Sequence, residues 1–397
     1  MNSKKLLYVI LILPLIITSG CAQILDTDAS MQPEPEEHEN MISEPTQTPE
    51  PMPVPTPTKT PVYTPEESPE PSQMQTHKLS PGFGFIDAHA DTISRALSLD
   101  QSQQNLYSND ALHVDFSRLA KFDAPVQVFA LWLSDAFVST AFEQTNLMLD
   151  FFEQEVKKHS DIIEIALDLD DIRRIAFDGK ISAILSIEGG EALMGNLENL
   201  DHFYNRGVRI LGLTWNRENA LGFGQATGST RGLKPFGIEV VQRMDELGMI
   251  VDVSHLNEAG FRDFQNISTR PYMASHSNAY SVLAHNRNLR DDQILAIVES
   301  GGIIGFNMFS SFIASMSRVT IDDVMAHFRH FIKIGAGNNI GLGCDFDGIH
   351  LTPEGITDVS SLKALREALA EEFDEDTAHR IMEGNFYEFF KRYFETE

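Results

Sequence analysis

The sequence predicts a (β/α)8 barrel, and three observations lead to this fold class. Eight short apolar runs rich in β-branched residues recur after residue 81, as is typical of strands buried on both faces of a parallel sheet. Segments with helical periodicity separate these runs. Polar side chains able to bind metal stand at or near the ends of five of the runs, where a barrel of this kind carries its functional groups.

The expected strands and helices alternate along the chain, which predicts a parallel sheet. The strands are expected at residues 83–87, 126–132, 181–187, 208–214, 249–254, 271–275, 302–307 and 340–344. Helical patterns occur at 146–159, 237–247, 291–299 and 322–334. A doubly wound open sheet is the alternative, but no glycine-rich phosphate loop follows the first run, which weakens its nucleotide-binding version.

Residues 1–20 have the features of an export signal. Lys4 and Lys5 precede an apolar run of about 12 residues, which is short for a membrane-spanning helix and typical of a secretion signal. Small residues then precede Cys21, an arrangement that resembles a bacterial lipobox. We therefore expect Cys21 to be lipidated and the exported protein to be anchored to the outer face of a bacterial cell membrane. An ordinary signal followed by a coincidental cysteine is the alternative.

Residues 21–80 are expected to form a linker. The segment from residue 22 to residue 80 holds 12 of the chain's 18 prolines, interspersed with Thr and Glu. Such a composition cannot bury a core and favours extended conformations, so it suits a spacer between membrane and domain. A ligand for a proline-recognition module is the less favoured interpretation. The barrel domain is therefore expected at residues 81–397.

Composition excludes one class of partner and predicts the state of a thiol. The net charge of −28 argues against binding to nucleic acid. The chain has two cysteines, so Cys344 has no disulfide partner if Cys21 is lipidated. Strand alternation points Cys344 away from the barrel interior, and we expect a buried, unreactive thiol.

The polar residues near the strand ends predict a metal centre. They are His89, Asp91, Glu188, His255, His276 and Asp345. Each alone could be a strand-end cap or turn former, but their shared position favours a common site. Imidazoles and carboxylates without thiolates suit zinc or another divalent first-row metal. The set is too large for one hydrolytic zinc and suits two ions that share a carboxylate.

Six segments carry a resemblance to a known family. FIDAHADT, LSIEGGEAL, GLTWNRENALG, GMIVDVSHL, SHSNAYSVLAHNRNLRDDQI and GLGCDFDGI occur in this order. Together they resemble the membrane dipeptidase family of the amidohydrolase superfamily, from about residue 84 to the C-terminus. The resemblance implies a barrel with two zinc ions that hydrolyses dipeptides by a metal-bridged hydroxide. It also implies tolerance of a D-residue on the C-terminal side, and the family commonly forms homodimers.

The resemblance also implies a role for each matching residue. His89 and Asp91 would bind the first zinc, His255 and His276 the second, and Glu188 would bridge the two. Asp345 would be the acid-base group, with Asp347 as the weaker candidate. Arg287 would pair with the substrate carboxylate, because a guanidinium holds a carboxylate by two parallel hydrogen bonds. His113 and His350 are further candidates to line the mouth of the barrel.

One position departs from the mammalian pattern of the family. Trp215 occupies the place of a histidine that is thought to stabilise the oxyanion. An indole donates one hydrogen bond but carries no positive charge. Oxyanion stabilisation is therefore expected to fall on the metals, or on a neighbour such as Asn216 or Asn219, and substrate preference is expected to differ.

Two other functions compete with a zinc dipeptidase. A related barrel hydrolase would act on another amide, lactone or cyclic substrate, although Arg287 favours a substrate that bears a carboxylate. A non-catalytic, lipid-anchored binding protein would use the barrel without chemistry. The complete set of metal ligands and the presence of Asp345 argue against this last reading.

Overall fold

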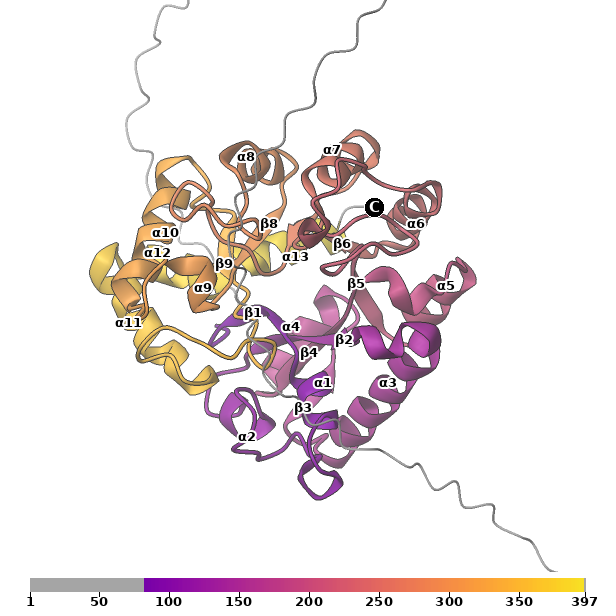
Figure 1. The fold of residues 1–397 in the computed structure, drawn as a ribbon. Helices are drawn as coiled ribbons and strands as arrows, with labels where there is room; N and C mark the ends of the chain where they lie inside the picture. Colours follow the sequence, from indigo (N-terminus) through magenta and orange to yellow (C-terminus); the bar gives the residue numbers. More distant parts are fainter. Residues whose placement is uncertain (1–81, 396–397) are drawn as a thin grey trace, which may run out of the picture. The chain divides into compact units, whose positions relative to one another are not determined.

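The computed structural model describes residues 82–395, which fold into a closed parallel barrel with an outer layer of helices (Figure 1). The strands are β1 (Ile86–Ala90), β2 (Val126–Trp132), β3 (Ile163–Ile165), β4 (Ile181–Glu188), β5 (Val208–Gly212), β6 (Ile250–Asp252), β7 (Met273–Ala274), β8 (Ile303–Phe306) and β9 (Ile340–Leu342). The sheet order is β2-β1-β9-β8-β7-β6-β5-β4-β3, and a β2–β4 pairing closes the ring. The predicted (β/α)8 barrel is confirmed.

The outer layer and the connections contain helices of varied length. They are α1 (Thr92–Leu97), α2 (Phe116–Leu119), α3 (Ala141–Lys158), α4 (Leu169–Phe177), α5 (Glu198–Asn205), α6 (Pro235–Leu247), α7 (Glu258–Ile267), α8 (Asp291–Glu299), α9 (Ser310–Ile313), α10 (Ile321–Lys333), α11 (Leu362–Glu372), α12 (Glu375–His379) and α13 (Asn385–Glu395). All four predicted helical patterns are present, with bounds shifted by up to five residues.

β3 is an addition that the apolar pattern did not predict. It pairs with the first three residues of β4, whereas β5 pairs with the later residues of β4 from Leu185 onward. β4 is therefore long enough to carry both neighbours on one edge, and the barrel closes without β3. With three residues, β3 is too short to show a periodic pattern of its own.

The predicted bounds of the first strand are wrong by three residues. β1 spans Ile86–Ala90, rather than residues 83–87, and continues through two polar positions. Asp87 is fully buried and accepts hydrogen bonds from the Cys344 N–H at 2.8 Å and the Gln127 amide at 3.1 Å. These partners satisfy the carboxylate inside the barrel wall, so the strand does not end where apolar character ends.

The pairing of β1 with β2 contains a bulge that determines which way His89 faces. Asp87 pairs with Gln127 but Ala90 pairs with Phe129, so three steps on β1 correspond to two on β2. An extra residue in a strand changes the face of every residue that follows it. Simple alternation from Ile86, whose side chain packs inside the barrel, would direct His89 outward. The bulge brings it to the interior.

Apolar side chains and a helix fill the barrel interior at the end where the strands begin. Seven of the eight ring strands contribute to one cluster, for example through Ile86, Val128 and Ile184, and α13 adds Phe386 and Phe390. Figure 1 draws α13 behind the strands. A Cβ atom on Gly341 of β9 would clash with the Phe386 ring, so this strand needs glycine there. This end of the barrel is therefore closed, which leaves the end where the strands finish for the site.

The buried histidine His327 gives a testable pH dependence of stability. Its Nδ1 accepts from the Ala279 N–H at 3.2 Å and its Nε2 donates to the Ile313 carbonyl at 3.0 Å, which fixes the neutral tautomer. Burial lowers the pKa of His327 from 6.5 to about 4. The unfolded chain therefore binds more protons between these values, and stability falls as pH drops from 6.5 to about 4.

We expect this one histidine to contribute about 3 kcal/mol of acid-induced destabilisation across that pH range. Urea unfolding of the wild type and His327→Gln at pH 7.5, 6 and 5 would measure it. The variant should be less stable at pH 7.5 but lose less stability on acidification. Equal losses in the two proteins would contradict the assignment.

The export signal, Cys21 and the linker lie outside the described residues. Within residues 82–395, no helix has both the length and the apolar character that a bilayer crossing requires. Cys344 is buried with a free thiol, and burial raises its pKa well above the ordinary value, as the prediction of an unreactive thiol requires.

Candidate metal centre

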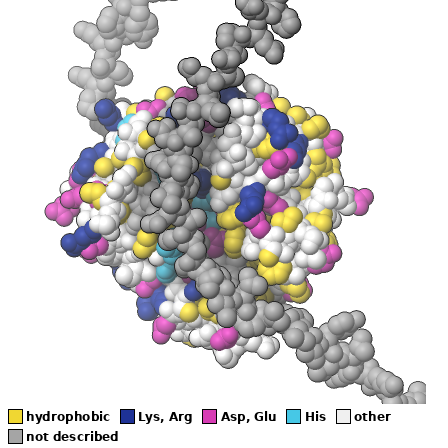
Figure 2. All heavy atoms as spheres, viewed as in Figure 1, with side chains coloured by type: hydrophobic (Ala, Val, Ile, Leu, Met, Phe, Trp, Pro, Cys, Tyr) yellow, Lys and Arg dark blue, Asp and Glu magenta, His cyan; other side chains and the backbone are white. Residues whose placement is uncertain are grey.

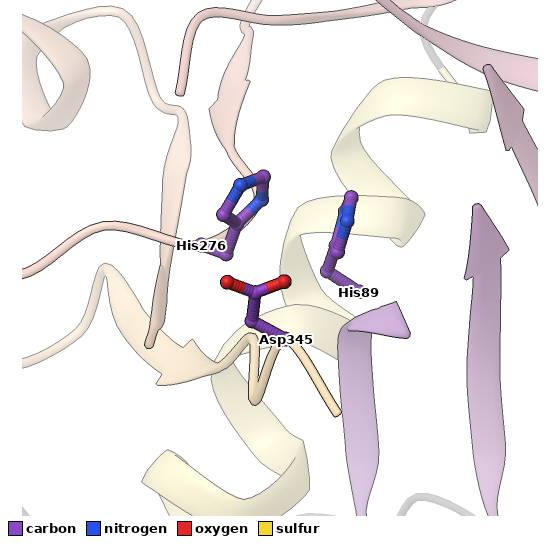
Figure 3. Close-up of side chains that lie close together, drawn as sticks. All are labelled: His89, His276 and Asp345. Carbon is purple, nitrogen blue, oxygen red and sulfur yellow. The ribbon is translucent and has the colours of Figure 1, made fainter. Parts of the chain in front are cut away.

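The six predicted metal-site residues meet at the open end of the barrel. His89 is in β1 and Glu188 ends β4, while the other four follow strands β1, β6, β7 and β9 within three residues. His89, His276 and Asp345 point toward one another from three separate strands (Figure 3). Histidine and acidic side chains are visible near the middle of this face (Figure 2).

These residues form three overlapping groups, in each of which the potential ligand atoms lie within 4.8 Å of one another. The groups are His89 with Asp91 and Glu188, Glu188 with His255 and His276, and His89 with His276 and Asp345. Glu188 is shared by the first two groups. The arrangement therefore contains two adjacent ligand sets with one carboxylate in common.

The two oxygens of Glu188 face different histidines. Oε1 lies 2.8 Å from His255 Nε2 and 3.5 Å from His276 Nε2. Oε2 lies 3.6 Å from His89 Nε2. Although burial alone would raise the pKa of Glu188, the neighbouring His89 holds it well below its usual range. Glu188 is thus an ionised carboxylate placed between two ligand sets.

The residues fit bound cations, because several buried atoms at the centre lack suitable partners. His255 Nε2 and His276 Nε2 approach to 2.9 Å. His89 Nε2 and Asp91 Oδ1 are buried without a hydrogen-bond partner. A buried polar group without a partner costs about 1–3 kcal/mol. Cations would satisfy these atoms and would separate the two facing imidazoles.

The neighbours of the histidines determine which ring nitrogen is free. Ser275 Oγ donates to Asp252 Oδ2, so the Ser275 oxygen can accept from His276 Nδ1 at 2.7 Å. Asn216 Oδ1 accepts from His255 Nδ1 at 3.1 Å. Both histidines then present an unprotonated Nε2 to the centre, which is the form that binds metal.

Asp345 and Asp347 differ in their surroundings. Asp345 Oδ2 accepts from Asn307 Nδ2 at 2.9 Å, and its carboxylate joins the group with His89 and His276. Asp347 is held by the Thr92 hydroxyl and by the N–H groups of the 113–114 backbone. Burial raises the pKa of Asp345 to about 8, with Asp91 and Glu188 adding to the shift and His89 opposing it. The geometry therefore favours Asp345 as the acid-base group.

A family model described as membrane dipeptidase, peptidase family M19, matches residues 73–395. The chain belongs to this membrane dipeptidase family. The family resemblance seen in the sequence motifs is thereby confirmed, and the family implies a metal cofactor that the clustered ligand groups fit.

Individual relatives and solved structures show how far the likeness extends. An uncharacterized dipeptidase of Schizosaccharomyces pombe is 32% identical over 265 residues, or 62% of this chain and 64% of that relative, so the chain spans slightly under two thirds of its length. A solved metallopeptidase dipeptidase of family M19 has a TM-score of 0.74 at 28% identity, over 79% of this chain and 100% of that chain. A metallopeptidase from Rhodobacter sphaeroides, solved with a phosphinate mimic of the dipeptide L-Ala-D-Ala, has a TM-score of 0.72 at 27% identity, over 78% of this chain and 99% of that chain.

Arg287 and Trp215 both lie near the segments that carry His255 and His276. Arg287 is buried and donates to the backbone carbonyls of Ser254 and His276. Trp215 packs edge-on against Trp132, with ring centroids 5.1 Å apart, and its ring lies 6.4 Å from that of His255. Both residues adjoin the clustered histidines of the predicted metal centre. Their roles toward substrate stay predictions, as does that of Asn216, whose oxygen contacts His255.

The sequence motifs did not reveal Asp252, Ser275 and Asn307 as parts of the site. Asp252 and Ser275 lie close to His255 and His276 within the recognised segments, so proximity to a predicted ligand was the available signal. Asn307 ends the predicted seventh strand at residues 302–307, which is a position that a barrel uses for function. Its contact with Asp345 spans 38 positions and depends on the closed sheet.

Replacing Ser275 by alanine is expected to weaken metal binding about 10–100-fold, because outer partners of this kind orient ligand histidines. His276 would lose its Nδ1 acceptor and the bias toward the metal-binding tautomer. Zinc affinity measured by competition with a chromogenic chelator would test this. Ser277→Ala, two positions along, is the matched control because Ser277 Oγ has no hydrogen-bond partner among the described residues. Equal affinity in wild type and Ser275→Ala would contradict the tautomer assignment.

Asn307→Ala is expected to lower kcat about tenfold with little change in KM. The Asn307 amide is fixed because its Oδ1 accepts from the Phe309 N–H at 2.7 Å while its Nδ2 donates to Asp345. Without this donor the Asp345 carboxylate is free to rotate, and misplaced catalytic groups reduce turnover. Asn307→Gln and Asn307→Asp separate loss of the donor from loss of size. A KM increase at constant kcat would instead indicate a substrate-binding role.

Proposed function

We propose that the protein is a metal-dependent dipeptidase that uses two zinc ions to hydrolyse the peptide bond of dipeptides. The position of Glu188 carries this proposal. Its two oxygens face separate histidines, so the site has two ligand sets joined by one carboxylate. The membership of the chain in the membrane dipeptidase family supports the same reaction.

The ligand sets assign residues to each ion. His89, Asp91 and Glu188 would hold one ion, and Glu188, His255 and His276 the other. Imidazole and carboxylate ligands support zinc, and manganese or cobalt would also be accepted. Two ions bound in this way supply an activated water nucleophile and polarise the carbonyl under attack.

The protein's own groups then handle the substrate and the protons. The carboxyl group of Asp345 takes the proton of the attacking water and passes it to the leaving amine. Arg287 pairs with the substrate carboxylate, after exchanging one of its backbone contacts for the ligand. Trp215 and Asn216 lie beside His255 and border the space for the scissile carbonyl.

The proposed substrate is a small molecule with a free amine, a scissile amide and a free carboxylate, which is the composition of a dipeptide. L,L-dipeptides and dipeptides with a D-residue at the C-terminal position are both proposed substrates. The Rhodobacter sphaeroides relative, solved with a mimic of L-Ala-D-Ala, supports acceptance of the second kind.

Amino acid release from L,L- and L,D-dipeptides by the full chain, stripped of metal and titrated with zinc, tests the proposal. Activity that rises to a plateau near two zinc per chain would support it. Two bound zinc without cleavage would overturn the dipeptide assignment and favour a related barrel hydrolase for another amide or a lactone, with Trp215 as the first residue to investigate. Failure to bind stoichiometric metal would overturn the metal centre itself.

We also propose that the chain is exported and anchored at the outer face of a bacterial membrane through lipid on Cys21. The lipobox resemblance and the proline-rich linker support this. Metabolic labelling with palmitate should mark the wild type and leave Cys21→Ala unlabelled. Equal labelling would contradict the anchor. Homodimer formation, implied by the family resemblance, would be tested by sedimentation of the full chain in detergent.

A further inference from the structure

A cavity of about 300 Å³ lies beside the metal centre, on the side of β1 and β9. Arg95 of α1, His113 and the segment 347–350 line it. Gly348 connects the two sites, because a Cβ atom there would overlap Asp91 Oδ2 and lie 2.6 Å from Asp345 Oδ1. Gly348 therefore separates the cavity from the carboxylates of Asp91 and Asp345.

The acidic residue of the cavity is already occupied by donors. Asp347 Oδ1 accepts from the His113 N–H at 2.6 Å, and Oδ2 accepts from the Thr92 hydroxyl at 2.7 Å and the Val114 N–H at 3.2 Å. These neutral donors fix the orientation of the Asp347 carboxylate but leave its negative charge in place, so an anion in the cavity must be attracted by Arg95, His113 and His350 more strongly than Asp347 repels it. Asp347 forms part of the wall.

The basic groups of the cavity remain available. Within residues 82–395, no carboxylate lies at ion-pair distance from Arg95, whose side chain is exposed. His113 Nδ1 accepts from the Asp347 N–H at 3.0 Å, so the neutral ring carries its proton on Nε2 and can donate from there. His350 is exposed, and its ring packs edge-on against Phe309 at 5.2 Å. Three side chains can thus donate hydrogen bonds or positive charge.

We infer that this cavity binds an anionic side chain on the N-terminal residue of the substrate, which makes acidic dipeptides such as Glu-X preferred substrates. The inference rests on the proposed dipeptidase function. Arg287 contacts the carbonyls that follow β6 and β7, so a substrate carboxylate held there lies across the centre from the cavity. With the scissile carbonyl at the metals, the N-terminal residue extends toward Gly348 and the cavity.

Charge and size agree with this occupant. The cavity volume lies at the lower end of the range for small-ligand pockets, which suits one side chain. A guanidinium holds a carboxylate by two parallel hydrogen bonds. The chain as a whole carries a net charge of −28 and repels anions, so selection of an acidic side chain requires local basic groups of this kind.

The test compares two dipeptides that differ in charge and hardly in shape, Glu-Ala and Gln-Ala, with Ala-Ala as the reference. For the zinc-loaded full chain at low salt, we expect kcat/KM for Glu-Ala to exceed that for Gln-Ala about fivefold, in line with a partly exposed ion pair. The ratio should fall as salt is raised. Arg95→Gln should bring the ratio near one without changing Ala-Ala, and Arg95→Lys should retain part of it.

Lys157→Gln serves as the charge control, because it removes one exposed positive charge in the last turn of α3 away from the cavity. It should leave the ratio unchanged. Cleavage of all three dipeptides at equal rates, or a ratio that survives Arg95→Gln, would overturn the inference while leaving the dipeptidase function intact.

A calorimetric measurement separates this inference from failure of the proposed function. L-glutamate should bind the zinc-loaded full chain more tightly than L-glutamine, and Arg95→Gln should abolish the difference. If no dipeptide is cleaved but this difference is found, the anion site stands and the dipeptidase function falls. If the difference is absent, the anion site falls.

Discussion

Replacing Glu188 by glutamine is expected to reduce dipeptide hydrolysis by more than about 100-fold and to prevent the binding of at least one metal ion. Loss of an outer partner of a metal ligand already costs about 10–100-fold, and Glu188 lies at the centre of both ligand sets. Glutamine offers one acceptor oxygen and no charge. Its NH2 group would face either His89 or the pair His255 and His276, where metal-binding nitrogens converge.

Zinc content after gel filtration and activity at saturating zinc would measure both effects of Glu188→Gln. Glu191→Gln is the matched control, because Glu191 lies three residues further on in the helical turn Gly190–Leu193, is partly buried and belongs to none of the ligand groups. It should bind metal as the wild type does. A Glu188→Gln protein that retains two zinc and normal turnover would refute the bridging role.

Asp345→Asn is expected to lower kcat by about 10²–10⁴, the range typical of a lost general acid-base group, while metal content is retained. The asparagine oxygen can still accept from Asn307, so the local structure should persist. The pKa of Asp345 is raised to about 8 by burial, and bound cations would lower this pKa. A base must be deprotonated to act, so wild-type activity should fall as pH drops through the metal-lowered pKa.

The pH-rate profile at saturating zinc would show whether Asp345→Asn removes this acidic limb. Asp347→Asn is the control. Asp347 accepts from two backbone N–H groups and one hydroxyl, so this change should reduce stability by about 1–3 kcal/mol and leave the turnover of folded protein largely intact. Loss of turnover in Asp347→Asn with normal turnover in Asp345→Asn would reverse the two assignments.

The sequence was most informative about the barrel strands, because parallel strands buried on both faces leave an apolar run that local inspection can find. All eight ring strands lie at or within a few residues of a predicted run. The misplaced bounds of β1 have one physical cause. Asp87 and His89 are buried polar residues whose partners, such as the Cys344 N–H, come from the other end of the chain.

The residues around the metal centre were harder to predict from the sequence, because the contacts that orient the centre join segments far apart in the chain. Ser275 reaches Asp252 across 23 positions, and Asn307 reaches Asp345 across 38. No local periodicity encodes such distances. The cavity is a stronger example, since Arg95 and His350 come from opposite ends of the domain and share a wall only because β1 and β9 are neighbours.

The two aspartates of the DFDG segment show most clearly what the sequence determines and what depends on the tertiary structure. The sequence by itself determined that carboxylates follow the last strand and that His89, Glu188, His255 and His276 stand at other strand ends, because strand ends and residue types are local properties. Strand alternation could not choose between Asp345 and Asp347, because a two-residue offset gives both the same side in an extended strand, and only the family resemblance favoured Asp345. β9 ends at Leu342, and both aspartates have positive φ, 60° and 68°, so alternation no longer applies. Their different surroundings are set by tertiary contacts, because backbone N–H groups from residues 113–114 bind Asp347 while Asp345 lies beside His89 and His276.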